Sequence, residues 1–166
     1  MTCKDAMLTI LQRQTEGLMY HDEMTDYYAF LNLSVLKDVH KKQTKEELCN
    51  LRKAKCNFIA TFGMLPIYNA TDPRIIPVEW KDKTTSDVDE QSLKILIKSS
   101  LNNYLNWEER TCDIYKSAAM VFKDNMNFPL YRHTCDLIEE VQCEIQKVKD
   151  LMLEAVTCGY HPTYFK

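Results

Sequence analysis

The chain has 166 residues, 45% hydrophobic and 27% charged, so it can bury the core of one domain but is short for two. Only 3 glycines and 5 prolines supply turns, which excludes a sandwich or barrel of many strands and favours an all-α fold. The net charge of −3 argues against a dedicated nucleic-acid binder, which neutralises phosphates with clustered lysine and arginine side chains.

No segment approaches the roughly 18 uncharged apolar residues of a membrane-spanning helix, and the first residues lack the apolar region and cleavage site of a signal peptide. These features predict a cytoplasmic protein without membrane contact. The cysteines show no CxxC or CxxxC spacing, which indicates reduced side chains buried inside helices rather than a zinc knuckle or a disulfide scaffold. They are Cys3, Cys49, Cys56, Cys112, Cys135, Cys143 and Cys158.

Apolar residues recur at the helical spacing of about 3.6 residues along four segments. The first helix is predicted over residues 4–31 and the second over residues 34–62, where Gly63 supplies a C-cap. Residues 64–85 contain three prolines, which a helix interior does not tolerate, and therefore form a long crossover. A link of this length can run along the whole bundle, so the two helices that it joins are expected to be parallel.

The third helix is predicted over residues 86–124, where Ser86 is the N-cap and acidic residues fill the first turn. The fourth is predicted over residues 129–157, with Pro129 in its first turn and Gly159 after its end. Residues 160–166 form an aromatic tail that either packs against an end of the bundle or contacts a partner. The prediction is a single domain over residues 1–166, an up-down-down-up four-helix bundle.

Ionisable residues on the apolar faces of these helices are the informative ones, because the solvent face is the usual place for a charge. Each helix contributes at least one of them when the sequence is projected at about 100° per residue. They are His21, His40, Glu47, Glu108 and Glu144, with Glu144 at the edge of its face. A bundle of four helices can therefore direct five ionisable side chains into one interior.

A buried carboxylate is costly unless it takes up a proton, finds a donor or binds a cation. A mixed set of carboxylate and imidazole ligands suits iron, manganese or zinc. The same five residues also allow a second interpretation, in which they satisfy one another and nearby tyrosine, glutamine and threonine side chains in a purely structural polar network.

The four helices with a long crossover resemble the ferritin-like superfamily, which includes ferritins, rubrerythrins and the DNA-protecting mini-ferritins. Shorter strings are similar to an uncharacterised bacterial and prophage group of ferritin-like proteins. These are YHDEMTDYYAFL at residues 20–31, IPVEW at 76–80 and DVD at 87–89. The resemblance implies a crossover between the second and third helices, and often a di-metal centre that activates oxygen or oxidises ferrous iron.

The sequence departs from the superfamily at the motif Glu-x-x-His, which di-metal sites usually carry on the second and fourth helices. The third residue after Glu47 is Asn50, and the third residue after Glu144 is Lys147. A standard di-iron centre or ferroxidase activity is therefore not implied. The resemblance carries over Glu47 and Glu108 as inward carboxylates and Glu144 on the fourth helix, and the two inward histidines would replace the missing ones.

Two functions follow, and the sequence leaves open whether the protein is an enzyme. The first is a metal-binding ferritin-like protein with iron or manganese inside the bundle and oxidative or storage-like chemistry, with a homo-oligomer as an open alternative to a monomer. The second is a metal-free helical module, such as a prophage accessory protein, that binds another protein through exposed Trp80, Trp107, Tyr164 or Phe165. Trp107 flanks the apolar stripe of its helix, so its position fits burial as well as contact. Nucleic-acid contact by the basic second helix is less favoured, because the lysines of that helix lie on a solvated face.

Overall fold

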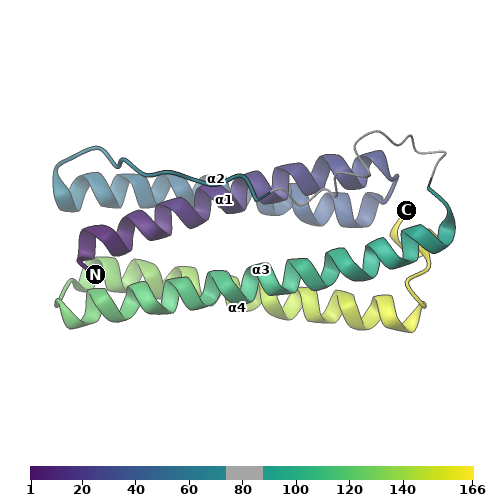
Figure 1. Cartoon of the computed structure of the whole chain (residues 1–166). Coiled ribbons are helices and arrows are strands. Elements are labelled where there is room, and N and C mark those ends of the chain that lie inside the picture. Colours follow the sequence, from purple (N-terminus) through teal and green to yellow (C-terminus); the bar gives the residue numbers. More distant parts are fainter. Residues whose placement is uncertain (74–87) are drawn as a thin grey trace.

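The computed structural model describes residues 1–73 and 88–166. Its helices are α1 (Cys3–Phe30), α2 (Ser34–Phe62), α3 (Glu90–Asp124) and α4 (Phe128–Thr157), followed by the short helix η3 (Pro162–Phe165). In Figure 1, α1 and α2 form one antiparallel hairpin and α3 and α4 form the other, and α2 ends at the opposite end of the bundle from the start of α3. The predicted all-α bundle with its up-down-down-up helix order is confirmed. The strings at residues 76–80 and the predicted N-cap Ser86 lie outside the described residues.

The helix ends have local causes in the sequence. The Thr2 hydroxyl accepts a hydrogen bond from the backbone N–H of Asp5, and the Asp5 carboxylate accepts one from the N–H of Thr2, which is a capping box. Gly63 ends α2 in the left-handed region at φ 64°, as a C-cap glycine does. At the start of α3, the Asp89 side chain accepts a hydrogen bond from the N–H of Ser92.

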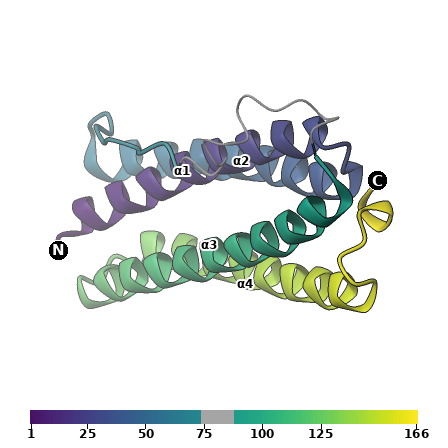
Figure 2. The ribbon, with the colours of Figure 1, turned by 45° about the vertical axis from the view of Figure 1, so that its right-hand side comes forward.

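The packing within each hairpin differs from the packing between the two hairpins. Helix α1 packs along α2 and α3 along α4, and the hairpins meet mainly through α1 and α3. Figure 2 shows the hairpins as two separate layers from a second direction. None of the helices in the described part of the chain combines the length and hydropathy that a bilayer crossing needs.

The buried core consists of two apolar clusters at the two ends of the bundle, with polar residues between them. One cluster contains Met7, Leu51, Cys112 and Leu137, and the other contains Tyr28, Leu36, Leu101 and Val148. Each helix contributes to both clusters, and on each helix a buried polar group lies between the two contributions. We call these groups the polar layer: Arg13, Gln14, His40, Gln43, Glu108, Thr111 and Glu144, together with His21 beside them.

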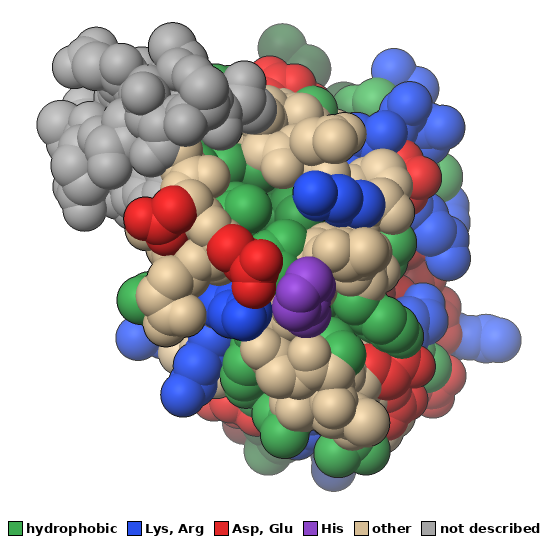
Figure 3. All heavy atoms as spheres, turned by 90° about the vertical axis from the view of Figure 1, so that its right-hand side faces the viewer, with side chains coloured by type: hydrophobic (Ala, Val, Ile, Leu, Met, Phe, Trp, Pro, Cys, Tyr) green, Lys and Arg blue, Asp and Glu red, His purple; other side chains and the backbone are tan. Residues whose placement is uncertain are grey.

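The C-terminal tail closes one end of the bundle. Pro162 and Phe165 of η3 are buried, and the Tyr164 hydroxyl donates a hydrogen bond to Glu154 at 2.9 Å. Figure 3 looks onto this end, where hydrophobic side chains show between charged ones and a histidine. The tail therefore packs against the bundle, and the expectation of an exposed Phe165 is wrong because its side chain is 0% exposed.

The cysteines correct a second expectation. All seven are unpaired, but Cys49, Cys56 and Cys143 are exposed and Cys112 alone is classed as fully buried. The prediction that the cysteines fill helix interiors is therefore wrong for the three exposed ones, of which Cys49 and Cys143 line a cleft between α2 and α4.

Candidate functional site

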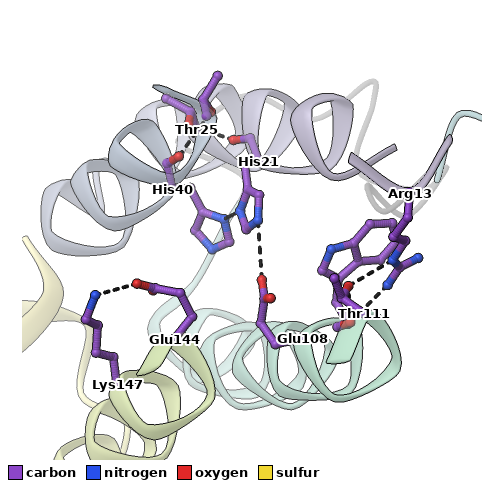
Figure 4. A network of polar contacts seen from close by, with 10 residues as sticks. Arg13, His21, Thr25, His40, Glu108, Thr111, Glu144 and Lys147 are labelled. Carbon is purple, nitrogen blue, oxygen red and sulfur yellow. Dashed lines mark hydrogen bonds and ion pairs between the residues drawn. The ribbon is translucent and has the colours of Figure 1, made fainter. Parts of the chain in front are cut away.

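The polar layer brings the predicted site residues to the space between the two hairpins. Figure 4 shows His21 extending from α1, His40 from α2, Glu108 from α3 and Glu144 from α4. His21 and His40 are 0% and 1% exposed, Glu108 is 3% exposed and Glu144 is 9% exposed. The structure thus buries four of the five residues that the sequence singled out, and Glu47 is half-buried beside them.

His21 and His40 form a buried pair. Their Nδ1 atoms lie 2.9 Å apart, so one ring donates an N–H to the other. Burial lowers the pKa of His21 to about 3 and lowers that of His40 well below its usual range. Both rings are therefore neutral at pH 7, which is the state that permits this hydrogen bond. The rings of Tyr20 and Tyr104 stand at 4.9 Å from His21 and 4.6 Å from His40, respectively.

Glu108 faces the other nitrogen of His21. The distance from His21 Nε2 to Glu108 Oε1 is 3.4 Å, which is longer than a well-formed hydrogen bond. Burial raises the pKa of Glu108 to about 8, and the charge of Glu144 adds to the shift. Without a cation nearby, Glu108 therefore holds a proton at pH 7.

Glu47 approaches the same region from α2, and its position depends on Gly17 of α1. Its Oε2 atom is enclosed and has no hydrogen-bond partner among residues 1–73 and 88–166. Burial, followed by the charge of Glu108, raises the pKa of Glu47 to about 8. A Cβ atom on Gly17 would stand 3.3 Å from both Cδ and Oε1 of Glu47, so the missing side chain makes room for the carboxyl group. A glycine inside a helix is otherwise unfavourable, so the presence of Gly17 was the one feature of the sequence that could have indicated this close approach.

Arg13 is a site residue that the sequence analysis missed. It is 8% exposed, and it donates hydrogen bonds to the Thr111 hydroxyl at 2.8 Å and to the Trp107 carbonyl at 2.9 Å. Its guanidinium lies 3.4 Å from the centre of the Trp107 ring, whose other neighbour is Tyr20 at 4.7 Å. The Arg13 charge lowers the pKa of Glu47 against the stronger effects that raise it. Trp107 is accordingly half-buried inside the bundle, which agrees with the first of the two roles, burial or partner contact, that its place beside the apolar stripe allowed.

An acidic cleft of about 600 Å³ opens between α2 and α4 and reaches Glu47 and Glu108. Its lining contains seven carboxylic acids and two lysines. The acids are Glu46, Glu47, Glu108, Asp136, Glu139, Glu140 and Glu144, and the lysines are Lys53 and Lys147. A concave surface with this excess of one charge attracts cations.

The same residues do not form a ready-made metal centre. Over residues 1–73 and 88–166, no group of three or more His, Cys, Asp or Glu side chains is gathered closely enough to hold a metal ion. His21 and His40 use one nitrogen each on the other, and the Glu144 carboxylate accepts a hydrogen bond from Lys147. A ferritin-type dinuclear centre does not fit, because Asn50 and Lys147 stand where its histidines would be.

The four long helices, their order and the polar layer define a ferritin-like four-helix bundle. Among solved structures, the chain is similar to the bacterioferritin of Desulfovibrio desulfuricans, with a TM-score of 0.61 over 95% of this chain and 79% of that chain. That protein has a diiron site, which has been observed in different catalytic states. The two sequences are 16% identical, so the similarity establishes the fold. No protein-family model and no curated protein matches the sequence.

Proposed function

We propose that this ferritin-like protein binds a single divalent metal ion, iron or manganese, at the base of the acidic cleft. Glu47 and Glu108 would be its principal ligands, and the neighbouring donors Glu144 and His21 Nε2 would have to move toward the ion to complete the set. The supporting observation is that two buried carboxyl groups with pKa values of about 8 share the inner end of an open acidic cleft. Such groups hold protons until a cation takes their place.

The histidine pair supports this assignment through its two proton arrangements. When His40 donates its Nδ1–H to His21, the Nε2 of His21 carries the proton of that ring and faces Glu108 as a donor. When His21 is the donor, its Nε2 presents a lone pair on the cleft side instead. His40 is therefore a positioning residue that orients the His21 ring and can hold it in the tautomer that binds metal.

Lys147 and Asn50 favour one ion over two. The Lys147 ammonium is bonded to Glu144, and the Asn50 amide donates a hydrogen bond to Glu140 at 2.7 Å. A second ion would have to displace the Lys147 charge and would find no imidazole at either position. A bound iron or manganese ion would supply Lewis-acid and redox chemistry in a site largely enclosed by protein.

The test is the metal content of tag-free protein after anaerobic loading with ferrous iron or manganese(II), measured by elemental mass spectrometry. We expect about one ion per chain in the parent and none in the Glu47→Gln/Glu108→Gln double variant, which keeps the shape of both side chains. Glu109→Gln is the matched control, because Glu109 follows Glu108 and is exposed. A parent without stoichiometric metal, or a double variant that binds as the parent does, contradicts the proposal.

The competing interpretation of a metal-free interaction module loses two of its contact residues, because Phe165 is buried and Trp107 is covered by Arg13 and Tyr20. Trp80 lies outside the described residues, and Tyr164 is 47% exposed. The homo-oligomer, the cytoplasmic location and the relation to the bacterial and prophage group remain predictions from the sequence.

A further inference from the structure

A second cavity, of about 330 Å³, lies beside the acidic cleft between α2 and α4. Its walls are mainly apolar, with Val39 from α2, Val148 and Leu151 from α4, and Tyr104 from α3. We call it the apolar pocket. Its volume is about twice the roughly 150 Å³ that admits benzene in an engineered protein cavity. It falls within the range of small-molecule sites.

The charged side chains around the apolar pocket are already engaged with other protein groups. The pairs are Lys42 with Glu46, Lys147 with Glu144, Asp150 with Gln146, and Glu154 with Tyr164. The five lining members of these pairs are two lysines and three carboxylates, and each of them is already engaged, so they supply no free counter-charge to an occupant. The pocket therefore favours an uncharged occupant, because a buried ion needs a counter-charge.

One polar group of the lining, the Tyr104 hydroxyl, has no such partner among the described residues. Tyr104 is 1% exposed. A tyrosine hydroxyl carries its proton at neutral pH and can donate one hydrogen bond. A buried donor without an acceptor is unfavourable, and an oxygen atom on the occupant would satisfy it.

We propose that the apolar pocket binds an uncharged molecule with a single ring and a carbonyl oxygen that accepts a hydrogen bond from Tyr104. The apolar walls take up the ring, and the Tyr104 hydroxyl fixes its orientation. The Tyr104 ring stands 4.6 Å from the His40 ring, so the occupant lies one side chain away from the histidine pair. This site goes beyond the proposed metal function and does not depend on it.

Binding is tested in metal-stripped protein, so that a failure of the metal proposal does not affect the result. Acetophenone has the ring and the carbonyl oxygen, ethylbenzene lacks the oxygen, and benzoate adds a charge. Titrations followed by NMR of the 15N-labelled protein give an affinity for each probe. We expect saturable binding of acetophenone, binding of ethylbenzene that is about fivefold weaker, as for one lost hydrogen bond, and no saturation by benzoate.

Two variants place the binding in the pocket. Tyr104→Phe keeps the ring but removes the donor, and should abolish the preference for acetophenone over ethylbenzene. Leu151→Trp fills the pocket from a partly buried position and should reduce both affinities at least tenfold, whereas Leu153→Trp, at a position 68% exposed on the same helix, should leave them unchanged. Thermal melts establish that each variant folds. Absence of saturable acetophenone binding overturns the proposal, as do Tyr104→Phe and Leu151→Trp proteins that bind like the parent.

Discussion

The two interfaces between the hairpins have opposite characters. Between α1 and α3 the contacts are direct and buried: Arg13 bonds Thr111, His21 faces Glu108, and the Tyr28 hydroxyl donates to Ser100 at 2.6 Å. Between α2 and α4 lie the acidic cleft and the apolar pocket, and the bridge at the rim is an exposed hydrogen bond from Asn50 to Glu140.

The difference indicates that the two interfaces have separate structural roles within one bundle. The α1–α3 interface holds the site residues in place through groups that are shielded from water, where hydrogen bonds contribute most. The α2–α4 interface leaves the inner ends of Glu47 and Glu108 accessible from one side. Four predictions test this contrast, beginning with the closed interface, where the largest effect is expected.

Arg13 should contribute most to stability. Arg13→Ala removes one buried and one partly buried hydrogen bond and the stacking on Trp107, and should lower the free energy of unfolding by about 3 kcal/mol. Arg13→Lys should recover less than half of this loss, because an ammonium neither stacks nor bonds two acceptors in one plane. Urea unfolding followed by circular dichroism measures both changes. Arg110→Ala, on the exposed face of α3, is the control, and a loss below about 1 kcal/mol for Arg13→Ala would refute the assignment.

The buried acids and histidines predict a pH profile for the metal-free protein. The pKa values of Glu47 and Glu108 rise from 4.5 to about 8 on folding, so their contribution to stability is present below pH 4.5 and is lost as the pH rises to 8. His21 and His40 act oppositely, because their pKa values fall from 6.5 and their contribution is lost as the pH drops below 6.5. Between pH 4.5 and 6.5 the two effects oppose each other.

Above pH 6.5 only the carboxyl effect remains, so stability should fall by on the order of 2 kcal/mol between pH 6.5 and 8. Urea titrations at a series of pH values provide the measurement. The Glu47→Gln/Glu108→Gln variant, whose amides do not titrate, should show a flatter profile over this range. An equal fall in the variant would show that other groups cause it.

A substitution at Gly17 tests how closely α1 approaches the Glu47 side chain of α2. Glycine to alanine inside a helix usually stabilises by about 1 kcal/mol. Here the new Cβ would meet the Glu47 carboxyl at 3.3 Å, so Gly17→Ala should bring no gain while Glu47 is present. In a Glu47→Ala background the gain of about 1 kcal/mol should return, which a double-mutant cycle measures. Equal gains in both backgrounds would mean that the carboxyl group does not need this space.

The rim bridge of the open interface should matter least. Asn50→Ala removes an exposed hydrogen bond to Glu140 and should cost about 0.5 kcal/mol relative to Asn103→Ala, an exposed asparagine on α3 that corrects for helix propensity. Thermal melts of the two variants give the difference. A cost as large as that of Arg13→Ala would remove the contrast between the two interfaces.

The sequence could predict the helices and their buried faces because both follow from periodicity along a single helix. His21, His40 and Glu108 were recognisable for the same reason, as ionisable groups within an otherwise apolar stripe. Arg13 and Gly17 were not, because their roles depend on Trp107 and Glu47, which belong to other helices. Contacts between helices leave no periodic signal in one segment.

The mouth of the acidic cleft is a second feature that could not be predicted from the sequence of a single helix. Asp136, Glu139 and Glu140 have the spacing of a solvated face on α4, and only the separation of α4 from α2 makes them part of a lining. The same separation explains why Cys49 and Cys143 are exposed rather than buried. How far apart two helices lie depends on the side chains of the whole bundle and cannot be derived from either helix alone.

Gln43, Glu144 and Lys147 belong to the linings of both the acidic cleft and the apolar pocket, so one wall separates the two cavities. A cation that draws Glu144 away from Lys147 would change the rim of the neighbouring pocket. Thermodynamic linkage then requires reciprocity: the factor by which the cation alters the affinity for acetophenone equals the factor by which acetophenone alters the affinity for the cation. Through this shared wall, occupancy of either proposed site would alter the binding affinity of the other.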